Sequence, residues 1–213
     1  MRKQGKLLIF GGAAIVSVAI AWAYVIWWRR NPSACPYCGW RFTLELPRPP
    51  WITRGRLREI LAPRSGERVL EVGLGTGYYA LEAARWIAPD GKLDVLDLQQ
   101  KMLDHTMRRA SDLRIDNIIP TRGEAQALPY PDNTFDCAYI ILTLGEIPNQ
   151  NAALLELHRD LKPSGRLVVG ESFPDPHMVT FDSLRSRVEE VGLHFERRLG
   201  GKLGYFASFR ASG

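Results

Sequence analysis

From residue 51 onward the chain alternates short apolar runs with amphipathic stretches whose hydrophobic residues recur every three or four positions. Short apolar runs are typical of buried strands, and amphipathic stretches are typical of helices that cover a sheet. The pattern predicts helices over residues 56–62, 78–88, 100–112, 150–160 and 180–191, and strands over residues 68–72, 92–96, 117–121, 135–142, 165–170, 193–199 and 203–210. This alternation predicts an α/β fold with a mostly parallel sheet and helices on both faces. The last two strands have no helix between them, so we expect a hairpin that turns at Gly200 and Gly201.

An uninterrupted apolar segment precedes this domain. Residues 7–28 carry no charge, and these 22 residues would span about 33 Å as a helix, which is enough to cross a bilayer. Aromatic residues crowd the end of the segment, and Arg29 and Arg30 follow directly, as at a membrane interface. The sequence therefore predicts a single transmembrane anchor in residues 1–30. A secretory signal peptide and a buried N-terminal helix are the alternatives.

Residues 31–50 form a linker with five prolines between this anchor and a domain over residues 51–213. The linker contains Cys35 and Cys38 in a CxxC pair, but a structural zinc site usually takes four ligands. The third cysteine, Cys137, lies in a predicted core strand. We therefore predict no metal site within one chain, and free thiols, zinc shared between two chains and a redox pair all stay open.

The strongest chemical signal is a glycine-rich turn between a predicted strand and a predicted helix. Gly73, Gly75 and Gly77 alternate with other residues, which lets the backbone turn sharply and approach a ligand at the helix N-terminus. A dinucleotide-binding turn would have a further glycine where this chain has Tyr78. Glu71, two residues before the first glycine, suits instead the α-ammonium group of an amino-acid ligand.

Asp97 ends the second predicted strand, 20 residues after Gly77, where a carboxylate can accept both hydroxyls of a ribose. With these residues the chain resembles the class I S-adenosylmethionine-dependent methyltransferases. The segments that carry the resemblance are residues 69–77, 97–103, 123–129, 135–136 and 161–167. The resemblance covers residues 51–210 and is nearest to enzymes that methylate quinones, lipids and other small molecules. It implies S-adenosylmethionine as cofactor and a Rossmann-like, seven-stranded sheet whose last strand is antiparallel.

The resemblance also implies where the cofactor binds, at the carboxyl ends of the strands. The residues expected there are Glu71, Gly73, Leu74, Gly75 and Gly77 for the methionine part, Asp97 for the ribose, Leu98 and Met102 on one face of the adenine, Glu124 and Ala125 at its edge, and Ile141 in the same cleft. We expect the Leu74 side chain to point away from the cofactor.

Two titratable residues, Glu146 and His177, follow the fourth and fifth predicted strands, where acceptors usually enter. Methyl transfer from a sulfonium depends mainly on alignment, and a base matters only if the acceptor must first lose a proton. Glu146 and His177 are therefore predicted as candidate catalytic bases. Helix capping for Glu146 and a solvated loop position for His177 are the alternatives.

These features predict a membrane-anchored enzyme that transfers a methyl group from S-adenosylmethionine to a small hydrophobic acceptor such as a lipid, a quinone or a thiol. A methyltransferase acting on RNA or protein and a non-catalytic adaptor are the alternatives. The net charge of +5 suits anionic membrane lipid and would equally suit nucleic acid. Basic and aromatic residues do not interleave as in nucleic-acid readers, so no nucleic acid partner is expected.

The cofactor also predicts the side of the membrane on which the domain lies. S-adenosylmethionine is cytosolic, so we expect the domain on the cytoplasmic side. Ala13, Ser17 and Ala21 place small residues on one face of the predicted span. A second anchor could pack there, which makes a homodimer possible in principle.

Overall fold

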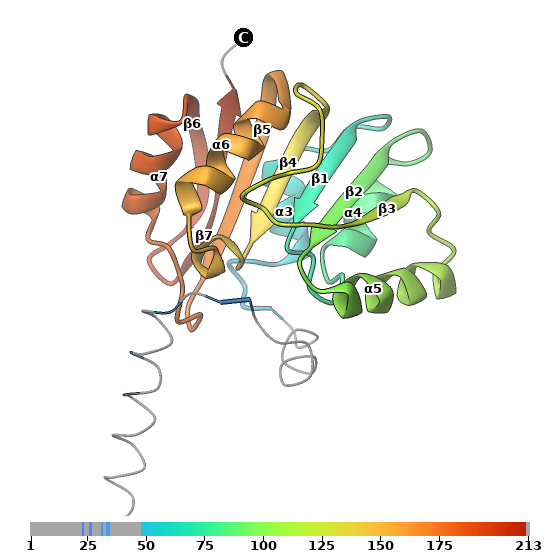
Figure 1. The fold of residues 1–213 in the computed structure, drawn as a ribbon, viewed down its shortest axis with the longest axis horizontal. Coiled ribbons are helices and arrows are strands. Elements are labelled where there is room, and N and C mark those ends of the chain that lie inside the picture. Colours follow the sequence, from blue (N-terminus) through green and yellow to red (C-terminus); the bar gives the residue numbers. More distant parts are fainter. Residues whose placement is uncertain (1–22, 24–25, 27–30, 32, 35–47, 212–213) are drawn as a thin grey trace, which may run out of the picture.

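The computed structural model describes residues 48–211 together with Ala23, Ile26, Asn31, Ser33 and Ala34. One sheet runs through the domain, with α6 and α7 in front of it and α3 and α4 behind it in Figure 1. The elements are α3 (Arg54–Leu61), β1 (Arg68–Val72), α4 (Ala80–Ile87), β2 (Lys92–Asp97), α5 (Gln100–Asp112), β3 (Ile118–Arg122), β4 (Phe135–Ile141), the 3-10 helix η1 (Leu144–Glu146), α6 (Gln150–Asp160), β5 (Leu161–Ser172), α7 (Phe181–Glu190), β6 (Leu193–Gly201) and β7 (Gly204–Ala211).

The sheet has seven strands in the order β3-β2-β1-β4-β5-β7-β6. Strands β1 to β5 pair in parallel, whereas β7 pairs antiparallel with both β5 and β6. This confirms the predicted seven-stranded, mostly parallel sheet with an antiparallel last strand. The strand order reverses between β1 and β4, and such a reversal opens a crevice at the carboxyl ends of the strands.

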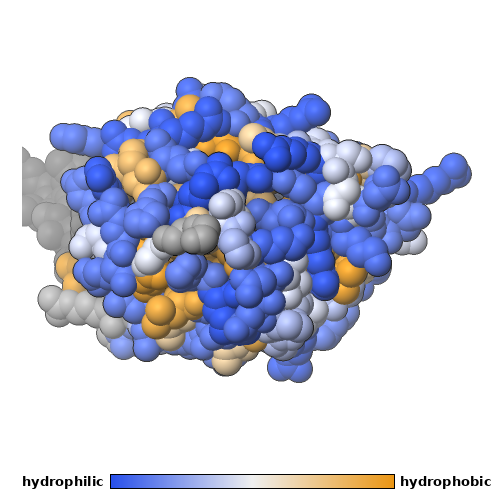
Figure 2. Space-filling view, turned by 90° about the horizontal axis from the view of Figure 1, so that it is seen from above, coloured by the Kyte–Doolittle hydropathy of each residue, from blue (hydrophilic) through white to orange (hydrophobic). Residues whose placement is uncertain are grey.

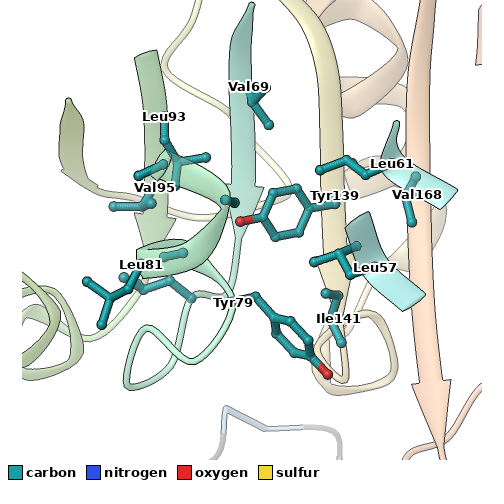
Figure 3. Packing of buried hydrophobic residues seen from close by; sticks show 14 of the residues in the cluster. Leu57, Leu61, Val69, Tyr79, Leu81, Leu93, Val95, Tyr139, Ile141 and Val168 are labelled. Carbon is teal, nitrogen blue, oxygen red and sulfur yellow. The ribbon is translucent and has the colours of Figure 1, made fainter. Parts of the chain in front are cut away.

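Each face of the sheet has its own hydrophobic core. Apolar residues of α3, α4 and α5 pack on one face, and those of α6 and α7 pack on the other. Figure 3 shows part of the first core, where the Tyr139 ring reaches from β4 toward β1 among Val69, Leu57 and Leu61. Every member of both clusters lies between Trp51 and Ala211. Both described cores are therefore formed within residues 51–211, which supports folding of this part without residues 1–30.

The hairpin between β6 and β7 corrects one expectation. The chain turns at Lys202 and Leu203, and the predicted turn residues Gly200 and Gly201 instead continue β6 in register with β7. Gly200 has a φ of +101°, and a Cβ at this position would lie 2.3 Å from the Gly204 carbonyl oxygen. Glycine is therefore required by close backbone approach within the strand pair, and sequence alone does not distinguish this use from a turn.

Most predicted elements have the expected place, with shifted ends. The strand predicted over residues 165–170 is longer, because Leu161 already pairs with Phe135 before an irregularity in the β4–β5 register. The helix predicted from residue 78 begins at Ala80, since the turn after β1 continues through Tyr79.

Several predictions fall outside the described residues: the anchor in residues 1–30, the CxxC pair and the helix face proposed for dimer packing. Within residues 48–211 and the five described positions before them, no helix combines the length and the apolar character needed to span a bilayer. The same described residues contain no group of three or more potential metal ligands, and Cys137 is a buried free cysteine.

Candidate active site

A cavity of about 810 Å³ lies at the carboxyl ends of the parallel strands. It is lined by the glycine-rich turn after β1, the end of β2, the loop after β3, the segment around η1 and the segment that follows β5. Its volume is within the range of sites for small molecules and cofactors. The sequence predicts a ligand site in this crevice, and the structure has a cavity at that place.

Three glycines shape the turn after β1. Gly73, Gly75 and Gly77 have φ values of +74°, +54° and +80°, in the region that side chains disfavour. A Cβ on Gly73 would lie 2.4 Å from the Thr143 side chain. A Cβ on Gly77 would lie 2.6 Å from the Thr106 side chain on α5, and Gly77 does not line the cavity. The third glycine is thus required by packing against α5, whereas Gly73 and Gly75 border the cavity.

Replacing Gly77 with alanine is therefore expected to lower the free energy of unfolding by about 1–3 kcal/mol, through overpacking and backbone strain. Denaturant unfolding measures this change. Gly55→Ala is the matched control, because a Cβ there meets nothing within 4 Å and Gly55 lies within α3. Equal stability of the two variants would contradict this account of the turn.

Glu71 is buried beneath the turn and lines the cavity, with 2% of its surface exposed. The Tyr139 hydroxyl donates a hydrogen bond of 2.7 Å to Glu71 Oε2. Burial raises the pKa of Glu71 to about 8; the charge of Asp97 adds to this rise, and the hydrogen bond from Tyr139 opposes it. A cationic ligand group in the cavity would therefore favour the ionised form of a carboxyl that is otherwise protonated at neutral pH.

This raised pKa predicts a pH-dependent affinity for S-adenosylmethionine. The resemblance implies that Glu71 holds the α-ammonium group, which only an ionised carboxylate can pair with, and the fraction of Glu71 ionised falls as the pH drops below about 8. Affinity is expected to weaken by up to about tenfold for each pH unit below that value. Isothermal calorimetry between pH 6 and 8.5 measures the slope. Glu71→Gln should bind more weakly and lose this slope, and a slope that persists in the variant would assign the titration to another group.

Asp97 lies at the end of β2 with 7% of its surface exposed. Its carboxylate accepts hydrogen bonds from the backbone N–H groups of Gln99 at 2.8 Å and Gly75 at 3.4 Å. Burial raises the pKa of Asp97, and the two backbone bonds oppose this shift. Each oxygen keeps a second lone pair, so the carboxylate can still accept two hydroxyl groups from the cavity.

The residues predicted around the adenine also line the cavity. Leu98, which is 46% exposed, and Met102, which is 2% exposed, both line the cavity. Glu124 and Ala125 line it from the loop after β3, and Glu124 Oε2 accepts a hydrogen bond of 3.4 Å from Gln126.

Leu74 and Ile141 complete the set of predicted cofactor residues. Both line the cavity, and both belong to the hydrophobic core on the α3, α4 and α5 face. Leu74 is 4% exposed, so its side chain is buried in this core.

The acceptor side differs from the prediction at one residue. Glu146 lines the cavity from η1, but His177 does not line it and instead lines a second cavity of about 280 Å³. Asp175, two residues earlier, lines the main cavity, and its Oδ1 accepts a hydrogen bond of 2.7 Å from the His177 backbone N–H. Burial raises the pKa of Asp175. The structure therefore brings Asp175, and not His177, to the acceptor side with Glu146.

A segment before α3 also borders the cavity, and the sequence did not indicate it. Arg48, Pro49 and Ile52 line the cavity together with Ser33 and Ala34. The segment is fixed at two points: the Tyr79 hydroxyl donates to the Ile52 carbonyl at 2.5 Å, and Trp51 Nε1 donates to Ser172 Oγ at 2.9 Å. These contacts join residues far apart in the chain, so no local pattern predicts them.

A family model for the ubiE/COQ5 methyltransferase family matches residues 51–184, most of this fold and nearly all of the cavity. The chain belongs to this family. Membership confirms the predicted class of S-adenosylmethionine-dependent methyltransferases and the predicted cofactor.

Two curated relatives carry the name ubiquinone/menaquinone biosynthesis C-methyltransferase UbiE. The protein of Saccharophagus degradans is 35% identical over 114 residues, which are 53% of this chain and 46% of the relative. That of Cellvibrio japonicus is 40% identical over 115 residues, which are 54% of this chain and 46% of the relative. The matched part of the chain thus spans about half the length of the curated relatives.

Solved structures agree with the family at the level of the fold. A methyltransferase from Aquifex aeolicus, described as dependent on S-adenosylmethionine, has a TM-score of 0.68 and 22% identity, and the match covers 74% of this chain and 88% of that chain.

Proposed function

We propose that this member of the ubiE/COQ5 family transfers a methyl group from S-adenosylmethionine to a small, hydrophobic, quinone-type ring at a membrane. One observation supports this most strongly: two buried carboxyl groups, Glu71 and Asp97, line the same cavity as an apolar acceptor side. The carboxyl groups suit the ammonium and ribose of the cofactor. The names of the curated relatives support a quinone-type acceptor.

The acceptor side of the cavity suits a hydrophobic ring. Its lining beyond the glycine turn includes apolar residues from three segments, Ile52, Ile147, Pro148, Phe173 and Pro174. Glu146 and Asp175 are the carboxyl groups among them, so a ring with one ionisable hydroxyl would find apolar walls and a proton acceptor.

The bound cofactor supplies an electrophilic methyl group, and the chain supplies alignment and a proton acceptor. The hydroxyl proton of the ring moves to the carboxylate of Glu146 or Asp175, which raises the electron density on the neighbouring ring carbon. The bound cofactor would supply its methyl group to that carbon, and its sulfur would leave with the electron pair of the broken bond. The ring carbon then loses its hydrogen as a proton to water, and the carboxyl group returns the first proton to the ring oxygen. Burial raises the pKa of Asp175, which makes its carboxylate a better proton acceptor than a fully solvated one.

The predicted anchor in residues 1–30 is part of this proposal, with the domain on the cytoplasmic side. The full chain is expected to stay in the membrane fraction through high-salt and carbonate washes, because an apolar span is held by hydrophobic burial and not by charge. Immunoblotting of the washed fractions measures this. Recovery of intact full-length chain in the wash would contradict the anchor.

Mass spectrometry of lipid extracts tests the proposed acceptor class. Cells that express the chain should accumulate a lipid-soluble ring compound that is heavier by one methyl group than its counterpart in cells without it. Cells that express Asp97→Ala serve as the control. Identical extracts from all three cultures would count against a lipid-soluble acceptor.

A further inference from the structure

Two exposed hydrophobic side chains lie next to each other at the edge of the cavity. Phe173 is 59% exposed and Leu203 is 57% exposed, the two highest values among the large hydrophobic residues that the structure describes. Phe173 follows β5, Leu203 lies in the β6–β7 turn, and the Phe173 N–H donates to the Leu203 carbonyl at 2.9 Å. Neighbouring exposed apolar residues of this kind are typical of an interaction surface.

Contacts of Trp51 hold the backbone next to both of these residues. Trp51 donates a hydrogen bond to Ser172, the residue before Phe173. The Trp51 ring also lies against Gly204, the residue after Leu203, where an added Cβ would be 2.0 Å from the ring. Both side chains therefore project from a rigid support, which suits insertion into an apolar environment.

This edge is also the mouth of the cavity. Phe173 and Pro174 line the cavity, and so do Ser33 and Ala34, two of the described residues that precede Arg48. The parallel strands end at the lower edge of the sheet in Figure 1, where the β6–β7 turn also lies. The predicted span ends at residue 28, so the five residue steps to Ser33 cover at most about 18 Å. A membrane at the end of that span would lie close to the mouth.

The charges around the mouth suit an anionic surface. Lys202 is exposed beside Leu203. The guanidinium carbons of Arg48 and Arg54 lie 5.1 Å and 4.0 Å from the centroid of the Tyr78 ring, which lines the cavity. The acidic residues nearby, Asp175 and Glu146, line the cavity itself and are partly buried. One basic residue, Lys202, thus adjoins the apolar pair and another, Arg48, borders the same cavity, as in proteins that bind the surface of anionic membranes.

We propose that Phe173, Leu203 and Lys202 form a membrane-contacting tip that places the cavity mouth on a bilayer containing anionic phospholipid. A hydrophobic acceptor then passes from the bilayer into the cavity without crossing water. This inference rests on the proposed function for the nature of the acceptor, but the tip binds lipid independently of cofactor and catalysis.

Vesicle flotation of the chain without residues 1–30 tests the tip, because both described cores lie between Trp51 and Ala211. The truncated chain should float with phosphatidylcholine vesicles that contain phosphatidylglycerol, and less with phosphatidylcholine alone. Leu203→Ser should lower the partition coefficient about fivefold. Leu203→Trp should keep the partition coefficient of the chain with Leu203 or raise it. Leu113→Ser is the matched control, since Leu113 is 46% exposed and precedes β3 at the opposite edge of the sheet.

Three results would overturn the tip: no flotation of the truncated chain, flotation unchanged by Leu203→Ser, or an equal loss in Leu113→Ser. Sedimentation velocity without lipid tests whether a second copy of the chain binds this edge instead of a membrane. A dimer that Leu203→Ser dissociates would make this edge a contact between two copies. Calorimetry with S-adenosylmethionine on the same samples separates this test from the proposed function. Loss of flotation in Leu203→Ser with intact cofactor binding supports the tip. Absence of flotation in the truncated chain itself overturns the tip and leaves the methyltransferase proposal standing.

Discussion

Replacing Glu146 with glutamine and Asp175 with asparagine in the same chain is expected to lower turnover on a protonated ring acceptor by about 10² or more. Both carboxyl groups line the acceptor side, and the double variant leaves no carboxylate there to accept the hydroxyl proton. The affinity for S-adenosylmethionine should change little, because Glu71 and Asp97, the carboxyl groups proposed to bind the cofactor, are intact. Single-turnover kinetics separates the two effects.

The single variants identify which carboxylate accepts the proton. Asp175→Asn keeps an oxygen for the bond from the His177 N–H, so the loop should hold its shape while the base is lost. His177→Ala removes a side chain that lines only the second cavity and should reduce turnover much less. Asp182→Asn, in the first turn of α7, is the neutral control, because Asp182 is not among the residues that line either cavity. Wild-type turnover in the double variant would leave alignment as the whole mechanism.

Replacing Asp97 with alanine is expected to weaken S-adenosylmethionine binding by roughly 1.5–3 kcal/mol, or about 10- to 150-fold, the scale for losing hydrogen bonds to a charged group. The change removes the predicted ribose contact and also the bonds from Gln99 and Gly75 that hold the cofactor turn in place. Calorimetry with the cofactor and with its demethylated product measures the loss.

Asp94→Ala is the matched control for this experiment. Asp94 lies on the same strand, is 1% exposed, pairs with Arg68 at 2.9 Å and does not line the cavity. Its removal should lower the stability of the fold and leave cofactor affinity nearly unchanged. If Asp97→Ala bound the cofactor as tightly as Asp94→Ala, the ribose would have to bind elsewhere.

The sequence predicted the parts of the site that depend on local patterns. The turn of Gly73 to Gly77 and the acid at Asp97 each follow an apolar strand, and parallel strands bring such positions to one edge. It did not separate Gly77, where contact with Thr106 on α5 leaves no room for a side chain, from the two glycines that border the cavity. That distinction depends on a neighbour 29 positions away in the sequence.

The acceptor side was harder to predict for a related reason. Asp175 and His177 lie in an irregular segment between β5 and α7, where no periodicity indicates which side chain faces the cavity. The bond from the His177 N–H to Asp175 sets that choice. The cavity border formed by Arg48 to Ile52 likewise depends on long-range bonds from Tyr79 and Trp51.

The most direct measurement of the central claim uses the full chain in liposomes with S-adenosylmethionine that carries a trideuterated methyl group. Membrane lipids that contain a ring acceptor lacking one methyl group are added, and the extracted products are analysed by mass spectrometry. The account predicts a trideuterated methyl group bonded to a ring carbon of a lipid-soluble compound, with turnover lost in Asp97→Ala. Tight binding of the cofactor with no label in any lipid-soluble product, while RNA or protein supplied in a parallel assay is labelled, would contradict it.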